Sequence, residues 1–124
     1  MIKQIENLPE NVIGFSYSGK VSGNDYETVI FPVVRKVKKR KKKIRILIEF
    51  TKGFKGLQPK AMMDDALVGI KYFHDWEKIA VVSNHEMLNH FIKAFSFVVP
   101  GRLKIFPSSE KSEAIDWVSK SGLK

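Results

Sequence analysis

Short apolar segments rich in β-branched residues, each followed by residues at helical spacing, constrain the fold of this chain more than any other feature. Such segments predict strands, and the spacing after them predicts helices. Strands that alternate with helices favour an α/β domain whose mainly parallel sheet is connected by right-handed crossovers. The three clearest strand segments are Ile44–Phe50 (IRILIEF), Lys78–Ser83 (KIAVVS) and Arg102–Phe106 (RLKIF).

The first part of the chain predicts a hairpin followed by a long helix. Residues 2–6 and 12–21 are extended segments that the turn-forming sequence LPEN joins. Ser22 then opens the cap of a helix over residues 25–42, in which Pro32 should cause a kink or remove a hydrogen bond. The complete predicted order is β-β-α-β-α-β-α-β-α, an α/β class with a mostly parallel sheet and an N-terminal hairpin strand.

Three shorter helices should follow the later strands. The first spans about Pro59 to Phe73, the second begins near His85, and the third is opened by SSE, residues 108–110. Apolar residues at helical spacing predict the face that each helix turns to the core. This stripe comprises Met62 or Met63, Ala66, Leu67, Ile70 and Phe73 in the first helix, and Ala114, Ile115, Trp117 and Val118 in the last.

The helix that begins near His85 has the most apolar stripe of the three. Its spacing predicts core packing for most of the stripe. The alternative is an apolar pocket or a surface for contact with a dimer partner or a lipid, because Met and Phe suit loosely specified apolar partners. Phe91 and Phe95 are candidate ligand-binding residues under this alternative. The whole stripe comprises Met87, Leu88, Phe91, Ile92 and Phe95.

A length of 124 residues is that of one domain, so residues 1–124 are expected to share one fold. The chain has no cysteine, which excludes a disulfide framework and thiolate chemistry and fits a reducing compartment. No stretch approaches the roughly 20 apolar residues of a membrane span, and the start lacks the pattern of a signal peptide. The sequence therefore predicts a soluble, cytoplasmic protein.

The net charge of +9 is concentrated in one segment. Residues 35–45 contain nine Lys or Arg residues and no acidic residue, and the rest of the chain is neutral. One interpretation is a solvated helix end, whose cations complement the helix dipole at roughly 0.3–1 kcal/mol each. The other is a surface for an anionic partner, because adjacent cations repel one another unless something screens them. The residues concerned are Lys38, Lys39, Arg40, Lys41, Lys42 and Lys43.

Among anionic partners of this basic segment, lipid is favoured over nucleic acid. Clusters of 4–8 basic residues beside a membrane attract anionic lipid at roughly 1 kcal/mol per charge. Nucleic-acid binding usually needs a basic face that is spread over an element and interleaved with aromatic or motif residues, and here the charge is local. If the segment binds a partner, we expect peripheral contact with the inner face of a membrane.

The carboxyl ends of the parallel strands form a second candidate site, because ligands of open α/β sheets usually bind there. The segment TKGFKG predicts a loop, in which two glycines allow sharp turns before a helix amino terminus that can hold an anion. The spacing matches no phosphate-loop pattern, so an ordinary loop is the alternative. The candidate ligand-binding residues here are Glu49, Thr51, Lys52, Gly53, Phe54 and Gly56.

The side chains that could perform chemistry form no recognisable catalytic or metal-binding pattern. His85 and His90 are five residues apart, which is not the i, i+4 spacing of two metal ligands on one helical face. Glu49 has no legible partner base or nucleophile, so a hydrogen-bond acceptor is its simplest role. We therefore expect no metal, no cofactor and no enzymatic activity.

Four segments, GKVSGNDYETVIFPVV, IRILIEFTKGFKG, KIAVVSN and LKIFPSSEKSEAIDWV, carry a resemblance that spans almost the whole chain. They resemble the STAS superfamily of bacterial anti-sigma-factor antagonists, and more closely the small SpoIIAA-like bacterial group, described as intermediate between STAS and CRAL-TRIO lipid-transfer domains. In sigma-regulating members, a phosphorylated serine begins the helix after the third strand. This chain has FTKGFKGLQP there, with Thr51 as its one hydroxyl. The resemblance thus implies the fold, without the usual serine switch.

Two functions from different classes are consistent with these observations. The first is a noncatalytic binding module for an apolar or amphiphilic, lipid-like ligand, with association to an anionic membrane surface. The second is a protein-interaction module of the anti-sigma-factor-antagonist type that lacks the phosphorylated serine. The partners allowed are a lipid or small amphiphile, a membrane surface, another protein and a second copy of the chain in a homodimer.

Overall fold

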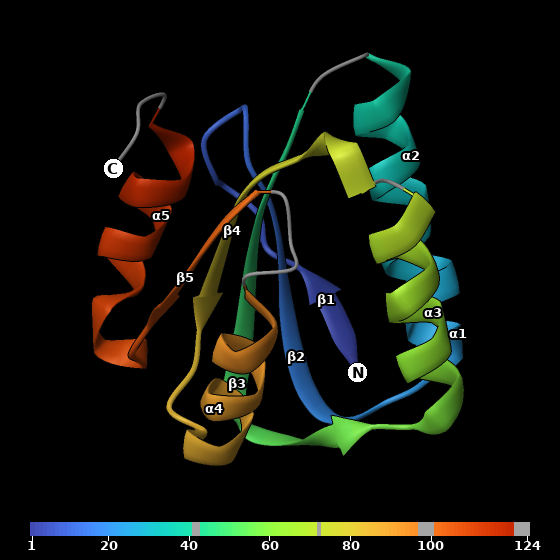
Figure 1. The fold of residues 1–124 in the computed structure, drawn as a ribbon, viewed down its shortest axis with the longest axis vertical. Helices are drawn as coiled ribbons and strands as arrows, with labels where there is room; N and C mark the ends of the chain where they lie inside the picture. The colour runs from blue at the N-terminus through green and yellow to red at the C-terminus, as the bar shows by residue number, and fades with distance from the viewer. Residues whose placement is uncertain (41–42, 72, 97–100, 121–124) are drawn as a thin grey trace.

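Five strands form one sheet in the order β1-β2-β3-β4-β5 (Figure 1). β1 (Ile2–Gln4) pairs antiparallel with β2 (Ile13–Val21), and the ladders that connect β2, β3, β4 and β5 are parallel. The predicted α/β class, with a mostly parallel sheet and an N-terminal hairpin, is confirmed. The structure is a computed structural model that describes residues 1–40, 43–71, 73–96 and 101–120.

Helical segments connect the parallel strands in the predicted order. After β2 the chain forms α1 (Gly23–Asp25), a π-helical segment (Tyr26–Ile30) and α2 (Phe31–Lys39), which follow one another without a break. The later elements are β3 (Ile44–Leu57), α3 (Pro59–Lys71), a 3₁₀ turn (Phe73–Asp75), β4 (Trp76–Val82), α4 (Glu86–Phe95), β5 (Arg102–Phe106), a second 3₁₀ turn (Ser108–Glu110) and α5 (Lys111–Ser119).

The first helical run begins at a capping box and ends earlier than predicted. The Ser22 hydroxyl accepts a hydrogen bond from the Asp25 amide, and the Asp25 carboxylate accepts one from the Ser22 amide. Pro32 is the second residue of α2, which directly follows the π-helical segment. Its ring and its missing N–H interrupt the α-helical ladder at this point. The helix ends at Lys39 and not at residue 42, since the residues after Val37 offer no apolar side chain that could hold another turn.

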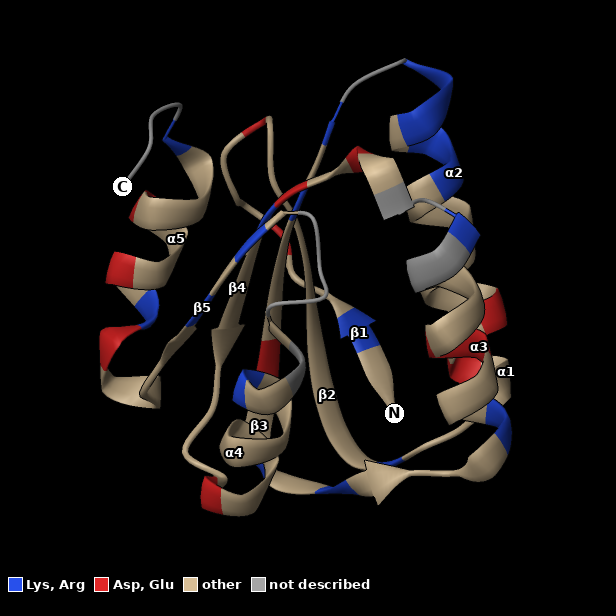
Figure 2. Ribbon diagram, in the orientation of Figure 1, with Lys and Arg blue, Asp and Glu red and all other residues tan. Residues whose placement is uncertain are grey.

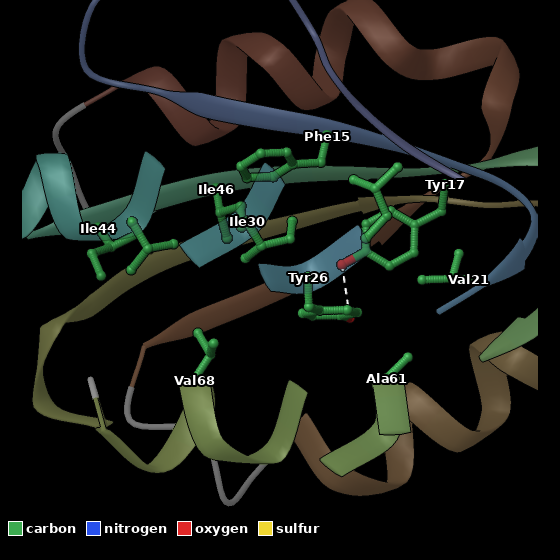
Figure 3. Close-up of a cluster of buried hydrophobic side chains, with 11 residues drawn as sticks. Phe15, Tyr17, Val21, Tyr26, Ile30, Ile44, Ile46, Ala61 and Val68 are labelled. Carbon is green, nitrogen blue, oxygen red and sulfur yellow. Dashed lines mark hydrogen bonds between the residues drawn. The ribbon is translucent and has the colours of Figure 1, made fainter. Parts of the chain in front are cut away.

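The two faces of the sheet carry separate apolar clusters. α1 to α3 lie on one side of the sheet and α5 lies on the other (Figure 1). The larger cluster joins the side chains of β2 and β3, such as Phe15 and Ile46, to those of the helices, such as Ile30 and Val68 (Figure 3). The smaller cluster lies beneath α5 and comprises Val12, Leu47, Ala80, Val82, Phe106, Ala114 and Val118.

The buried face of α3 differs from the predicted stripe. Met62, Met63, Ala66 and Leu67 are exposed, whereas the buried residues among those of this helix whose side chains are described are Ala61, Asp64 and Val68. Small residues face inward because α3 packs closely on α1, where a Cβ added to Gly23 would lie 2.3 Å from Cγ of Lys60. The buried Asp64 accepts a hydrogen bond from Lys60 at 2.7 Å. The predicted core side chains of Ile70 and Phe73 lie outside the described residues.

A chain of hydrogen bonds runs through the larger cluster. The Tyr17 hydroxyl donates to the Tyr26 hydroxyl at 2.8 Å (Figure 3). The Tyr26 hydroxyl in turn donates to the Asp65 carboxylate at 2.9 Å. Both tyrosines are buried. Burial raises the pKa of each phenol, and the nearby Asp65 carboxylate raises it further.

These tyrosines predict a loss of stability at alkaline pH. A phenol in the unfolded chain ionises near pH 10, whereas in the fold it stays neutral well above that pH, so their contribution is complete below pH 10 and decreases above it. Between pH 9 and 10.5 the wild type should lose about 1.5 kcal/mol more unfolding free energy than a Tyr17→Phe/Tyr26→Phe variant. Urea unfolding at both pH values measures this difference, and identical losses in the two proteins would contradict it.

Two buried cations hold the carboxyl end of α5. Lys78 Nζ donates to the carbonyl oxygens of Trp117 and Lys120 at 2.8 and 2.7 Å, and it lies 4.9 Å from the centre of the Trp117 ring. Arg45 donates to the carbonyls of Val118 and Lys120 and forms an ion pair with Glu77. Burial lowers the pKa of Lys78, and repulsion from Arg45 and Arg102 lowers it further. The cations satisfy carbonyls that every helix end leaves without helical partners.

Candidate functional site

The segment predicted as a loop after Phe50 is instead the second half of β3. Residues 51–57 continue the strand, and Phe54, Gly56 and Leu57 pair with Gly19, Lys20 and Val21 of β2. Gly19 and Gly56 have φ values of 57° and 125°, which glycine adopts readily, and the register of the two strands shifts beside Gly19. The loop prediction is therefore wrong, because the long β2 offers a partner for TKGFKG.

An aromatic cluster connects this strand extension to the start of α4. The ring of Phe54 lies 4.8 Å from that of Phe50 and 5.8 Å from the ring of His85. His85 Nε2 lies 2.7 Å from the carbonyl oxygen of Thr51, and the Thr51 hydroxyl donates to the carbonyl oxygen of Tyr17 at 3.1 Å. His85 is the N-cap residue of α4, but its ring contacts the sheet and caps no amide of the helix.

The candidate residues at the carboxyl end lie on both faces of the sheet. Glu49 accepts a hydrogen bond from Lys111 of α5 at 3.0 Å, which places it on the α5 side. Phe54 belongs to the cluster on the opposite side. Lys52 and Gly53 are exposed, and Thr51 and Gly56 are half-buried. The geometry thus brings Thr51 and Phe54 together with His85 but separates them from Glu49.

The stripe of α4 that was predicted to pack in the core is largely exposed. Met87 is 87% exposed and Phe91 is 62% exposed, while Leu88 and Ile92 are half-buried. The core prediction is therefore wrong for Met87 and Phe91. Phe95 is the last residue of α4, and its side chain lies outside the described residues.

A cleft of about 710 Å³ separates α4 from β5. On the helix side it is lined by polar residues, among them Asn89, His90 and Lys93, and on the strand side by Leu103 and Ile105. Phe106 faces α5, so Leu103 and Ile105, which alternate with it, face the side on which α1 to α3 lie. α4 forms the other wall of the cleft and therefore lies on the same side of the sheet as α1 to α3. Sequence reasoning did not find this cleft, because its residues come from three separate segments.

The basic segment lies at the end of α2 (Figure 2). Lys38 is half-buried and forms an ion pair of 2.9 Å with Asp75, so it is not part of a fully solvated helix end. Lys43 donates to the carbonyl oxygen of His74 at 2.8 Å. Lys39 and Arg40 are exposed, as are Arg35 and Lys36. Lys41 and Lys42 lie outside the described residues.

A groove of about 290 Å³ between α2 and α3 adjoins this basic end. Phe31 and Arg35 line it from α2, and Leu67, Val68 and Lys71 line it from α3. Leu67 is one of the exposed large apolar residues. The groove therefore places cationic and apolar side chains next to each other.

Two kinds of feature are absent from the part of the chain that the structure describes. No group of three or more His, Asp or Glu residues is arranged to hold a metal ion there. None of its helices combines the length and the apolar character needed to span a bilayer.

Comparisons with known proteins agree with the fold. The sequence profile of the SpoIIAA-like family matches residues 12–119. The crystal structure of an uncharacterised protein of the DUF3478 family from Shewanella loihica PV-4, which has a SpoIIAA-like fold, superposes with a TM-score of 0.76 at 23% identity and covers 94% of this chain and 93% of that chain. No curated protein matches the sequence.

Proposed function

Because this chain belongs to the SpoIIAA-like family, whose profile spans residues 12–119, we propose that it is a noncatalytic, STAS-type binding module for a lipid-like amphiphile and that it associates with anionic membrane surfaces. One observation carries this proposal. Among the described residues, five of the six exposed large hydrophobic side chains lie on α3 and α4, which cover the same face of the sheet: Met62, Met63, Leu67, Met87 and Phe91. Exposed apolar side chains that gather on one face mark an interaction surface.

Charge supports a membrane as the partner of this surface. The groove between α2 and α3 brings Arg35 and Lys71 beside the apolar Leu67, and the basic end of α2 follows directly. A surface that combines exposed apolar residues with Lys and Arg fits the interface of a bilayer, where apolar side chains enter the acyl boundary and cations meet anionic head groups. This arrangement would hold the protein at the membrane without a spanning helix.

The cleft beside α4 supports a bound amphiphile. Its volume of about 710 Å³ lies within the range of roughly 300–1,000 Å³ that is typical of small-molecule sites. Its two walls differ in character, because the α4 side is polar and the β5 side presents Leu103 and Ile105. A ligand with a polar head and an apolar chain would match both walls.

The apolar surface can be tested by two double variants, Met63→Gln/Leu67→Gln on α3 and Met87→Gln/Phe91→Gln on α4. Each should weaken sedimentation with vesicles of phosphatidylcholine and phosphatidylserine about tenfold, because a buried apolar side chain of this size contributes roughly 1.5–3 kcal/mol and only part of it enters the bilayer. Vesicles of phosphatidylcholine alone serve as the control for charge. Unchanged sedimentation of both variants would contradict the proposal.

Native mass spectrometry of freshly purified protein provides an independent test. A copurified lipid or fatty amphiphile is the expected result. A bare chain that also fails to sediment with anionic vesicles would instead favour the protein-interaction module, because neither membrane nor ligand would then account for the exposed face of α3 and α4.

A further inference from the structure

The polar side of α4 faces the cleft, although the helix is amphipathic. Glu86, Asn89, His90 and Lys93 line the cleft, and their spacing of three and four residues places them on one face of the helix. The apolar Met87 and Phe91 of the same helix are exposed and do not belong to the cleft lining. The helix therefore turns polar groups toward a cleft whose opposite wall carries apolar side chains.

Asn89 has an acceptor that lacks such a partner. Its side-chain Nδ2 donates to the carbonyl oxygen of Ser83 at 3.0 Å, and this contact fixes the amide orientation because a carbonyl can only accept. Its Oδ1 atom is buried and accepts no hydrogen bond within the described part of the chain. A buried acceptor without a donor destabilises the fold, so a small rotation of the Asn89 side chain that brings Oδ1 to a donor of a ligand in the cleft would be favourable.

The charge of Lys93 favours an anion on the carboxyl-terminal side of Asn89. Lys93 is one helical turn further, about 6 Å along the axis, and His90 lies between the two. The other lysine of the lining, Lys104, directs its ammonium group to the ring of Phe106 at 5.1 Å, on the α5 side. Glu86 is the one acid of the lining and lies about 4.5 Å from Asn89 in the opposite direction along the helix.

We propose that the cleft binds the singly protonated phosphate monoester head of a small amphiphile. Lys93 pairs with the anionic oxygens, Asn89 Oδ1 accepts the hydrogen bond of the P–OH group, and the apolar chain lies on Leu103 and Ile105. This inference deepens the proposed function and rests on it, since it assigns a head group to the amphiphile. A sulfate ester carries the same charge but no proton, and a sugar head donates hydrogen bonds but has no charge.

Isothermal titration calorimetry at pH 6 with four probes tests each part: octyl phosphate, octyl sulfate, octyl glucoside and inorganic phosphate. At this pH about half of the phosphate monoester keeps its P–OH proton. Octyl phosphate should bind at least tenfold more tightly than each of the other three. Amide NMR spectra recorded with octyl phosphate should show their largest shift changes at Asn89, Lys93 and Leu103.

Two variants assign the roles of the residues. Lys93→Gln should weaken octyl phosphate binding about tenfold, whereas Lys3→Gln, which removes an exposed lysine outside the cleft lining, should leave it unchanged. Asn89→Ala should remove the preference for octyl phosphate over octyl sulfate. If Asn89→Ala does not fold, the comparison of the two esters on the wild type still tests the donor, since it requires no variant.

Each failure identifies the part that is wrong. Equal binding of octyl phosphate and octyl sulfate overturns the role of Asn89, and equal binding of octyl phosphate and octyl glucoside overturns the anion site. Equal binding of inorganic and octyl phosphate assigns the site to free phosphate and overturns the amphiphile. If no octyl probe binds while anionic vesicles still do, the cleft inference fails and the membrane proposal stands.

Discussion

Replacing Lys78 with alanine is expected to lower the unfolding free energy by about 2–4 kcal/mol. The side chain is 2% exposed, and its ammonium group is hydrogen-bonded to the carbonyls of Trp117 and Lys120. Its loss leaves the Trp117 carbonyl without this donor and opens a cavity beneath α5, and both effects destabilise the fold. Urea unfolding at pH 7, followed by far-UV circular dichroism, measures the difference.

Lys78→Met separates the two contributions, because it restores most of the volume but not the donors. It should recover part of the lost stability. Lys55→Ala, at an exposed position on β3, should stay within about 0.5 kcal/mol of the wild type. Burial lowers the pKa of Lys78, so its charge is itself unfavourable in the fold. If Lys78→Met is as stable as the wild type, the hydrogen bonds to α5 only offset the cost of burying the charge.

Changing Arg35, Lys36, Lys39 and Arg40 to glutamine is expected to weaken binding to vesicles that contain phosphatidylserine by a factor on the order of 10³ at low salt. Each basic residue near such a surface contributes roughly 1 kcal/mol, and each 1.4 kcal/mol corresponds to a factor of ten. All four side chains are exposed, so the fold should lose little stability. Wild-type binding should also weaken steeply as salt rises, since salt shortens the range of these charges.

A matched control exists on the same chain. Lys3, Lys20, Lys52 and Lys55 are also exposed, and changing these four to glutamine produces the same net charge without altering the end of α2. This control should retain most of the vesicle binding. Equal binding of the two variants would show that total charge, and not the local cluster, governs association. Preference of the wild type for DNA over vesicles at matched salt would assign the cluster to nucleic acid.

The order of elements could be predicted from the sequence because it depends on local spacing. The segments IRILIEF, KIAVVS and RLKIF form the predicted parallel strands, and Ser22 caps the first helix where its side chain indicated. The segment TKGFKG was misjudged because two glycines and two lysines are typical of a loop. Its pairing depends on β2, which lies more than thirty residues earlier in the chain and is long enough to continue the ladder.

The candidate site was harder to predict, because it depends on how elements meet. Glu49 and Phe54 were assigned to one site because both were expected at the carboxyl end of the parallel strands, yet they face α5 and the opposite cluster respectively. His85 contacts Thr51 from the following crossover, a pairing that no sequence motif indicates. Nothing in the sequence indicated Asn89 as a candidate site residue, since an asparagine in a helix is ordinarily exposed and hydrogen-bonded to water.

The periodicity of each segment, the location of the positive charge and the amphipathic character of α4 follow from residue type and spacing alone. Which face of each helix is buried depends instead on how the elements pack against one another. α3 turns Ala61 and Val68 inward because α1 lies too close for methionine, and α4 leaves Met87 and Phe91 exposed and turns polar residues toward the cleft. The physical reason is that an apolar stripe favours contact with any apolar partner, whereas shape and the space left by neighbouring elements select which partner is available.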